Sequence, residues 1–273
     1  MTAAGAPQRT AAAGPRRAAV GLGTQTLVLA GSLARSWARQ PGIAIQAVVF
    51  PAFLLLMFQT VLGRTVDAMG GGESVYRNAG LIALIGVMYG SLATGIGLIT
   101  ERESGLLARQ WTLPVPRAGF LAGRLLAELA RALVSTAVLF GLAVCLGFRF
   151  SQGFAAGIGA FVVPVAFAAA CALGIIAMAT VTSEKQIVQV FGALFLLAMF
   201  FNTGFVPLDQ YPGWLQPVVR WQPMSPAIDL MRGLTEGGAV AVPLAASAAW
   251  IVVIALLGGI VAARGFRHAA TAR

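Results

Sequence analysis

The residues best suited to chemistry lie in one short stretch, ERESGLLARQWTLPVPR at positions 101–117, between two long runs with almost no charge. It holds three Arg, two Glu and one Trp, side chains that form ion pairs and dock against other proteins. Residues 101–113 are predicted to form a helix of about three turns. Pro114 and Pro116 end this helix, because proline lacks the amide donor and disfavours helix in the residue before it. The stretch is therefore a bounded element joined stiffly to two apolar segments.

The predicted helix has an apolar side that suits contact with another protein. Helical spacing gathers one cluster there: Leu106, Leu107, Gln110 and Trp111. Docking of a helix into a groove is one recognition mode, and a plain loop resting on lipid headgroups is the alternative. We expect a partner to contact a set of nine residues in and around this helix: Glu101, Arg102, Glu103, Gly105, Leu106, Leu107, Arg109, Trp111 and Pro114.

Three further charged residues follow at helical spacing. Arg124, Glu128 and Arg131 are four and three residues apart, which places Glu128 between two cations on one helical face. Such a set could relay charge or contact a partner. The alternative, which we favour, is a self-paired cluster at the mouth of a membrane span, with the Arg stems reaching toward the headgroups.

Familiar catalytic and metal-binding patterns are missing from the sequence. Lys185 is the single lysine and follows Ser-Glu, so the phosphate-binding pattern GxxxxGK[ST] is absent. His268 is the single histidine and lies near the end of the chain, which argues against a Ser-His-Asp set and an HExxH metal site. Cys145 and Cys171 lie in apolar runs without a CxxC pair. We therefore expect no catalytic residue, no metal and no cofactor in this chain.

The composition predicts that lipid surrounds most of the chain. Of 273 residues, 58% are hydrophobic and 10% are charged, against about 25% charged in an ordinary soluble domain. About 20 apolar residues in a helix cross the hydrocarbon core. Six runs meet this length and predict an all-α polytopic membrane protein: 43–62, 79–99, 123–147, 154–181, 187–206 and 243–263.

The positive charges predict the orientation of these spans. Thirteen of the nineteen Lys and Arg residues fall on the side that holds both termini and the 101–117 stretch. Basic residues mark the cytoplasmic side of a membrane protein, so we expect both termini in the cytoplasm. The net charge of +10 does not indicate nucleic-acid binding, because the Arg residues flank apolar spans and do not form one basic face.

Three segments outside the spans have their own character. Residues 1–23 are predicted to be a disordered cytosolic tail. Residues 24–39 are predicted to form an amphipathic helix in the headgroup layer, with a plain linker as the alternative. Four residues are expected to belong to this interfacial helix: Leu27, Leu33, Trp37 and Arg39. Residues 207–242 are too apolar for a free loop and are predicted to form short helices that re-enter the outer leaflet. Four residues of this outer segment stand out, three of them aromatic and suited to the membrane interface: Pro207, Tyr211, Trp214 and Trp221.

Two longer motifs carry a family resemblance. TERESGLLARQWTLPVPRAGFLAGRLL and GFVPLDQYPGWLQPVVRWQPMSPAIDLMRGL resemble the membrane subunits of type-2 ABC exporters, within them the actinobacterial daunorubicin-resistance permeases and those that export mycobacterial phthiocerol lipids. The resemblance covers residues 24–268. It implies a single transmembrane permease domain in a bacterial cell membrane, with a connecting helix at 24–39 and a coupling helix in 101–117. It also implies a second permease subunit, identical or paralogous, and ATPase subunits that bring ATP and Mg.

The resemblance also implies that the second and fifth spans flank a central path. The candidate lining residues are Met88, Tyr89, Thr94, Phe195, Met199 and Asn202. For the polar ones, hydrogen bonding between helices is the alternative and the favoured reading. The function that follows is a permease subunit of an ATP-driven exporter of a lipid or a hydrophobic or amphipathic drug-like compound. The alternatives are an ATP-independent carrier or channel for hydrophobic solutes and an intramembrane enzyme such as a lipid transferase.

Overall fold

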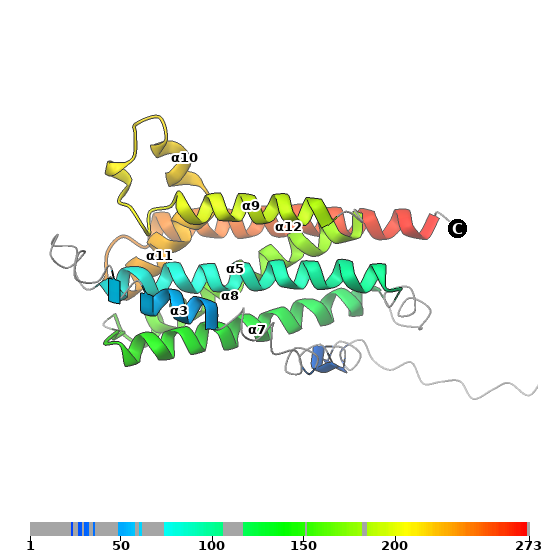
Figure 1. Cartoon of the computed structure of the whole chain (residues 1–273), viewed down its shortest axis with the longest axis horizontal. Helices are drawn as coiled ribbons and strands as arrows, with labels where there is room; N and C mark the ends of the chain where they lie inside the picture. Colours follow the sequence, from blue (N-terminus) through cyan, green and yellow to red (C-terminus); the bar gives the residue numbers. More distant parts are fainter. Residues whose placement is uncertain are drawn as a thin grey trace, which may run out of the picture.

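Long helices lying lengthwise beside one another make up the body of the protein in the computed structural model (Figure 1). They are α5 (Ser74–Glu103), α7 (Arg117–Cys145), α8 (Phe154–Val181), α9 (Lys185–Phe200) and α12 (Ala241–Thr271). The structure describes residues 23, 27–28, 30–32, 35, 49–57, 60–61, 74–105, 117–150, 152–181 and 185–271. This described part consists of helices, turns and irregular segments without a strand, as the all-α fold class predicts.

Four helices of the described part are long and apolar enough, by length and composition, to cross a membrane. They are Ala79–Glu101, Ala122–Cys145, Phe154–Ala177 and Ala241–Val261, which match the second, third, fourth and sixth predicted spans. The first predicted span lies partly outside the described residues, and α3 (Phe50–Met57) occupies its described centre. Helix α9 covers the fifth predicted span with 16 residues.

Helix α9 ends at Phe200, six residues before the predicted end of the fifth span at position 206. The reason is local hydrogen bonding by Asn202. Its Oδ1 accepts from the backbone amides of Gly204 at 2.7 Å and Phe205 at 3.3 Å, while its Nδ2 donates to the Ala198 carbonyl at 3.3 Å. A side chain that satisfies backbone groups in this way turns the chain out of the helix. The apolar sequence continues past this turn, so hydropathy alone extends the span too far.

The predicted outer segment does contain short helices. They are the 3-10 turn η3 (Leu208–Gln210), α10 (Gln216–Trp221) and α11 (Met224–Glu236). Helix α11 packs against α5, α8 and α12, and most of its first two turns are buried. Figure 1 shows α10 and α11 at one end of the bundle, whereas the C-terminal end of α5, the start of α7 and the C-terminal end of α12 lie at the other end.

Helix α8 is the central helix of the bundle. It packs against α12, α5, α7, α11 and α9. Its sequence is rich in small residues, and Ala168, Ala170 and Ala172 are almost completely buried. Small side chains let helices approach closely inside a membrane, where packing replaces the hydrophobic effect as the force that joins them. Helix α8 thus positions α5 and α7 on one side and α12 on the other.

The described start of the 101–117 stretch differs from the prediction. Glu101, Arg102 and Glu103 form the last turn of α5 and do not begin a separate helix. The helix ends at Glu103, and a turn follows in which Ser104 N donates to the Thr100 carbonyl at 3.0 Å. Gly105 in this turn has a φ of +72°, a conformation that favours glycine. Residues 106–116 lie outside the described residues, and α7 begins at Arg117.

Candidate functional site

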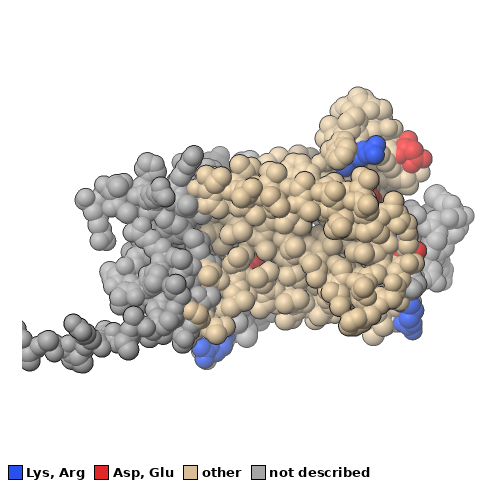
Figure 2. All heavy atoms as spheres, turned by 180° about the vertical axis from the view of Figure 1, so that it is seen from behind, with Lys and Arg blue, Asp and Glu red and all other residues tan. Residues whose placement is uncertain are grey.

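Charged side chains gather at the two ends of the described surface. Figure 2 shows Lys, Arg, Asp and Glu mainly at these ends, with a nearly uncharged face between them. Apolar side chains of α12, such as Val252 and Leu256, are exposed in the isolated chain. A surface of this kind suits lipid or another apolar helix. Ionic groups between the two ends must therefore be inside the bundle.

An ion pair joins the two helices that flank the 101–117 stretch. Arg124 Nη2 of α7 donates to Glu101 Oε2 at the end of α5. The Arg124 side chain is 4% exposed and the Glu101 side chain is 28% exposed, so the pair is shielded from water on its arginine side. The contact spans 23 residues of sequence and joins the last turn of α5 to the N-terminal part of α7. It makes the last turn of α5 and the start of α7 one connected base.

A second ionic network lies deeper, between α5 and α7. Arg131 Nε donates to Glu128 Oε2 at 3.0 Å, and Arg131 Nη2 donates to Glu128 Oε1 and to the Val87 carbonyl, the latter at 3.1 Å. Ser91 and Thr94 of α5 each donate to one Glu128 oxygen at 2.8 Å. The Glu128 side chain is 0% exposed and the Arg131 side chain 7% exposed. Glu128 thus carries its charge in a fully hydrogen-bonded setting.

Gly90 provides the room for this network. A Cβ atom at position 90 would lie 1.6 Å from Arg131 Nη1, so no side chain can stand there while the guanidinium keeps its place. Arg131 Nη1 is buried and donates no hydrogen bond within the described part of the chain. The guanidinium is therefore pressed flat against the backbone of α5. Its contact with Val87 and Gly90 fixes the register of α7 against α5.

The structure corrects the expected pairing of the charge cluster. Arg124 and Arg131 do not share Glu128: Arg124 pairs with Glu101 on α5, and Glu128 pairs with Arg131. Arg131 also lies deeper than a cluster at the membrane mouth would. It is nine residues inside the candidate span Ala122–Cys145, or about 14 Å along the helix. Spacing within one helix predicted which residues face the same side and could not show that a neighbouring helix supplies an acid.

The predicted path residues separate into two groups. Met88 and Asn202 are almost completely buried, and Thr94 donates to Glu128, which agrees with the favoured reading of hydrogen bonding between helices. Tyr89 is 37% exposed on α5. Phe195 and Met199 of α9 are half-buried and pack against the apolar core.

Several predicted contact residues lie outside the described residues. In the 101–117 stretch they are Leu106, Leu107, Arg109, Trp111 and Pro114, and in the N-terminal segment Leu33, Trp37 and Arg39. The Arg102 side chain is also outside the description. The described residues between 23 and 35 are all helical, and Leu27 is 65% exposed.

The outer segment exposes its tryptophans, as an interface position predicts. Trp214 is 77% exposed and Trp221 55% exposed, while Pro207 and Tyr211 are half-buried. The Tyr211 hydroxyl donates to the Asn202 carbonyl at 3.1 Å. The Trp250 indole nitrogen of α12 donates to the Trp221 carbonyl at 2.8 Å, which fastens α10 to the bundle.

A polar cluster that sequence reasoning missed fixes the outer segment to the end of α9. Thr203 Oγ1 donates to Asp229 Oδ1 at 2.8 Å, and Arg232 Nη2 donates to the Thr203 carbonyl at 3.2 Å. Burial raises the pKa of Asp229 above its ordinary value, while the Thr203 bond and the charges of Arg232 and Arg220 oppose the rise. The three-residue spacing of Asp229 and Arg232 was a usable signal in the sequence. Their partner Thr203, which follows the end of α9, gave no such signal.

Asp229→Asn should change how stability depends on pH. The folded state binds the Asp229 proton more tightly than the unfolded chain does, so this contribution is present in acid and is lost as pH rises through the raised pKa. The neutral variant avoids that loss. Its Tm in detergent, compared with that of wild type, should therefore rise as the pH is raised from about 4, the ordinary pKa of an Asp, toward neutral. Asp209→Asn, at an exposed position of η3, is the control; a Tm difference between Asp229→Asn and wild type that stays constant over this range would contradict the expectation.

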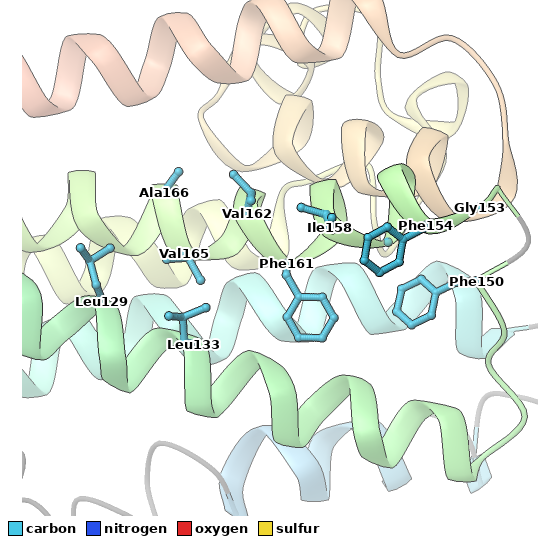
Figure 3. A pocket seen from close by; sticks show the side chains of 11 residues that line it. Leu129, Leu133, Phe150, Gly153, Phe154, Ile158, Phe161, Val162, Val165 and Ala166 are labelled. Carbon is cyan, nitrogen blue, oxygen red and sulfur yellow. The ribbon is translucent and has the colours of Figure 1, made fainter.

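An apolar groove of about 890 Å³ lies between α7 and α8. Leu129 and Leu133 of α7 line one side, and Phe161 and Val165 of α8 face them (Figure 3). No lining residue is charged. An uncharged lining of this kind suits the binding of an apolar group.

The sequence matches a described protein family over most of its length. Residues 24–235 match the family described as ABC-2 type transporter. The chain is 39% identical over 247 residues, 90% of each chain, to "Probable doxorubicin resistance ABC transporter permease protein DrrC" of Mycobacterium tuberculosis strain H37Rv. It is 31% identical over 220 residues, 78% of this chain and 77% of the relative, to "Daunorubicin resistance ABC transporter permease protein DrrB1" of Streptomyces coeruleorubidus.

Proposed function

Because this chain belongs to the ABC-2 type transporter family, we propose that it is the membrane-spanning subunit of an exporter driven by a separate ATPase subunit. One observation carries this proposal: a membrane permease of an ATP-driven family lacks the phosphate-binding loop in its own sequence. ATP and Mg would bind to the partner, and this chain would hold the path. Glu128, an acid inside the bundle, is fully hydrogen-bonded and paired with Arg131. This pairing supports the ATP-driven permease over an ion-coupled carrier.

The proposed cargo is a lipid or a hydrophobic or amphipathic drug-like compound, taken from the cytoplasm or the inner leaflet. Two observations support this class. The relatives are named for resistance to doxorubicin and daunorubicin. The described face between the ends of the bundle is nearly uncharged, which disfavours a strongly charged polymer.

The proposed topology has six spans in the bacterial cell membrane, with both termini cytoplasmic. The arrangement in Figure 1 supports it, because the C-terminal end of α12, the C-terminal end of α5 and the start of α7 share one end of the bundle. The excess of Lys and Arg belongs to that same side. Helices η3, α10 and α11 would then face the outside, and residues 24–39 would form the interfacial helix.

The proposed coupling element is the 101–117 stretch. The ion pair between Glu101 and Arg124 supports this proposal, because it joins the end of α5 to the start of α7. A force applied to the loop would therefore reach both helices together. The network of Glu128 and Arg131 joins the same two helices about one leaflet deeper, so the pair would move as a unit.

The proposed assembly contains a second permease subunit, identical or paralogous, and the path would lie between the two. Exposed side chains on α9 support an open face there, among them Leu194, Leu197 and Phe200. Of the path candidates we keep Tyr89, Phe195 and Met199. Met88 and Asn202 are buried inside this subunit and Thr94 is bound to Glu128, so they would need a rearrangement to meet a cargo.

Reconstitution tests the proposed function. The chain is purified with an ATP-binding subunit and placed in liposomes, and doxorubicin serves as the probe because relatives carry its name. We expect ATP-dependent movement of doxorubicin that requires both chains, and an ATPase rate that changes when this chain is present. Movement by this chain alone under a pH gradient, without ATP, would instead support the carrier alternative.

A further inference from the structure

The groove between α7 and α8 is a recess and not a passage. Behind the lining residues Phe150 and Phe161 lie Phe140 and Phe148, which are 2% and 0% exposed. Phe140 stands 5.1 Å from Phe161 and 5.6 Å from Phe150, measured between ring centroids. This aromatic cluster closes the inner side of the groove at one end. A molecule in the groove would therefore rest against a preformed wall and would not cross the bundle.

The length and position of the groove match one leaflet of a bilayer. It begins at the α7–α8 turn, where Phe150 and Phe154 line it, and ends near Leu129 and Ala166. Phe154 and Ala166 are twelve residues apart on α8, or about 18 Å. One leaflet supplies about half of the 30 Å hydrocarbon core. Except for Phe150 and Gly153 of the turn, the lining belongs to the candidate spans Ala122–Cys145 and Phe154–Ala177.

A cation stands at the end of the groove where a headgroup would lie. Arg149 precedes the lining residue Phe150 in the α7–α8 turn and is exposed. Its Nη1 donates to the carbonyls of Val144 at 2.9 Å and Phe148 at 3.0 Å, which holds the guanidinium over the end of α7. No Lys or other Arg occurs between Arg131 and Lys185 in the sequence. Arg149 thus places a cation at this mouth of the groove, and the chemical complement of its guanidinium is an anion.

We propose that this groove binds an anionic phospholipid, with one acyl chain between α7 and α8 and the phosphate at Arg149. The apolar lining selects a hydrocarbon chain, the leaflet-long extent selects a single chain that does not cross the membrane, and Arg149 selects the anionic headgroup. The site lies on this chain alone. It depends neither on which compound is exported nor on the presence of an ATPase.

Native mass spectrometry of the full chain in detergent tests the site. The delipidated protein is mixed with phosphatidylglycerol or with phosphatidylcholine of the same acyl chains, and the bound fractions are compared. We expect about a fivefold preference for phosphatidylglycerol, the effect of one basic residue near a phosphate. Arg149→Gln should bring this ratio close to one while a chain still binds. Leu133→Trp, which places a ring in the groove from a half-exposed position, should reduce binding of both lipids severalfold.

Two matched variants separate the groove from the rest of the surface. Arg220→Gln removes an exposed cation on α10, and Val252→Trp adds a ring at an exposed position of α12; both should bind lipid like wild type. If Leu133→Trp does not give a monodisperse protein, Ile158→Trp on α8 replaces it. Equal binding of the two lipids by wild type, or unchanged binding in the groove-filling variant, would overturn the proposal. So would a disulfide between two copies of Val162→Cys, which would assign the groove to a contact between permease chains.

Discussion

Glu128→Leu is expected to cost the folded protein about 3–5 kcal/mol, the usual effect of removing one partner from a buried ion pair. The Arg131 guanidinium would lose its acceptors on Glu128 and keep only the Val87 carbonyl at 3.1 Å. Ser91 would lose an acceptor for its hydroxyl, and Thr94 likewise. The charge cannot reach water, because the Arg131 side chain is 7% exposed and lies about 14 Å inside a candidate span. Little folded protein should remain after purification in detergent.

The double variant Glu128→Leu/Arg131→Met is the matched control. It removes both charges and keeps the side-chain volume, and apolar replacement of a whole buried pair is often neutral or stabilising. We expect it to recover most of the yield and most of the thermal stability lost by the single variant. The measurement is Tm by fluorescence-detected size exclusion for wild type, both single variants and the double variant, which together form a double-mutant cycle.

Two outcomes would contradict this account of the network. A single variant as stable as wild type would mean that water or a rearranged side chain compensates Arg131 without Glu128. A double variant as unstable as the single one would mean that the volume around Gly90, and not the charge, decides stability. Transport by a stable double variant would then show whether the ionic network serves folding alone.

Hydropathy predicted the bundle because lipid demands the same property of every span. A helix must satisfy its own backbone and present apolar side chains for about 20 residues, and both demands are visible in α8 and α12 without any partner. The short helices of the outer segment were also visible, since Pro and Gly interrupt an otherwise apolar run. These features depend on nearest neighbours in the sequence.

The details that failed depend on contacts between distant residues. Arg124 is four residues from Glu128, yet its partner acid is Glu101, 23 residues earlier on another helix. The end of α9 is decided by Asn202, whose side chain replaces the helical bonds that hydropathy takes for granted. The partners of Glu128 were equally hidden, because Ser91 and Thr94 are ordinary residues in an apolar helix. The need for a glycine at position 90 also follows only from the structure, because it depends on where the Arg131 guanidinium lies.

Leu107→Asp/Trp111→Asp is expected to lower ATP-dependent transport at least about a hundredfold. Both residues belong to the apolar side of the proposed coupling element, outside the described residues. Burying a side chain of this size against a partner contributes about 1.5–3 kcal/mol, so losing two weakens docking by more than 3 kcal/mol, or about two factors of ten. The Asp side chains add the cost of an unpaired charge in the contact. The chain itself should still fold, because the changed residues stand beyond the Glu101–Arg124 base.

The control variant is Ala108→Asp/Thr112→Asp. It adds the same two charges at the same four-residue spacing, on another side of the predicted helix. Co-purification with the ATP-binding subunit and transport in liposomes are measured for both variants. If 101–117 docks through its apolar side, only the Leu107 and Trp111 variant should lose the partner, while its Tm stays near that of wild type. Full assembly and transport in the Leu107 and Trp111 variant would contradict the apolar side as the coupling contact, and so would an equal loss in both variants. The charged residues Glu101, Glu103 and Arg109 would then be the remaining candidates for that contact.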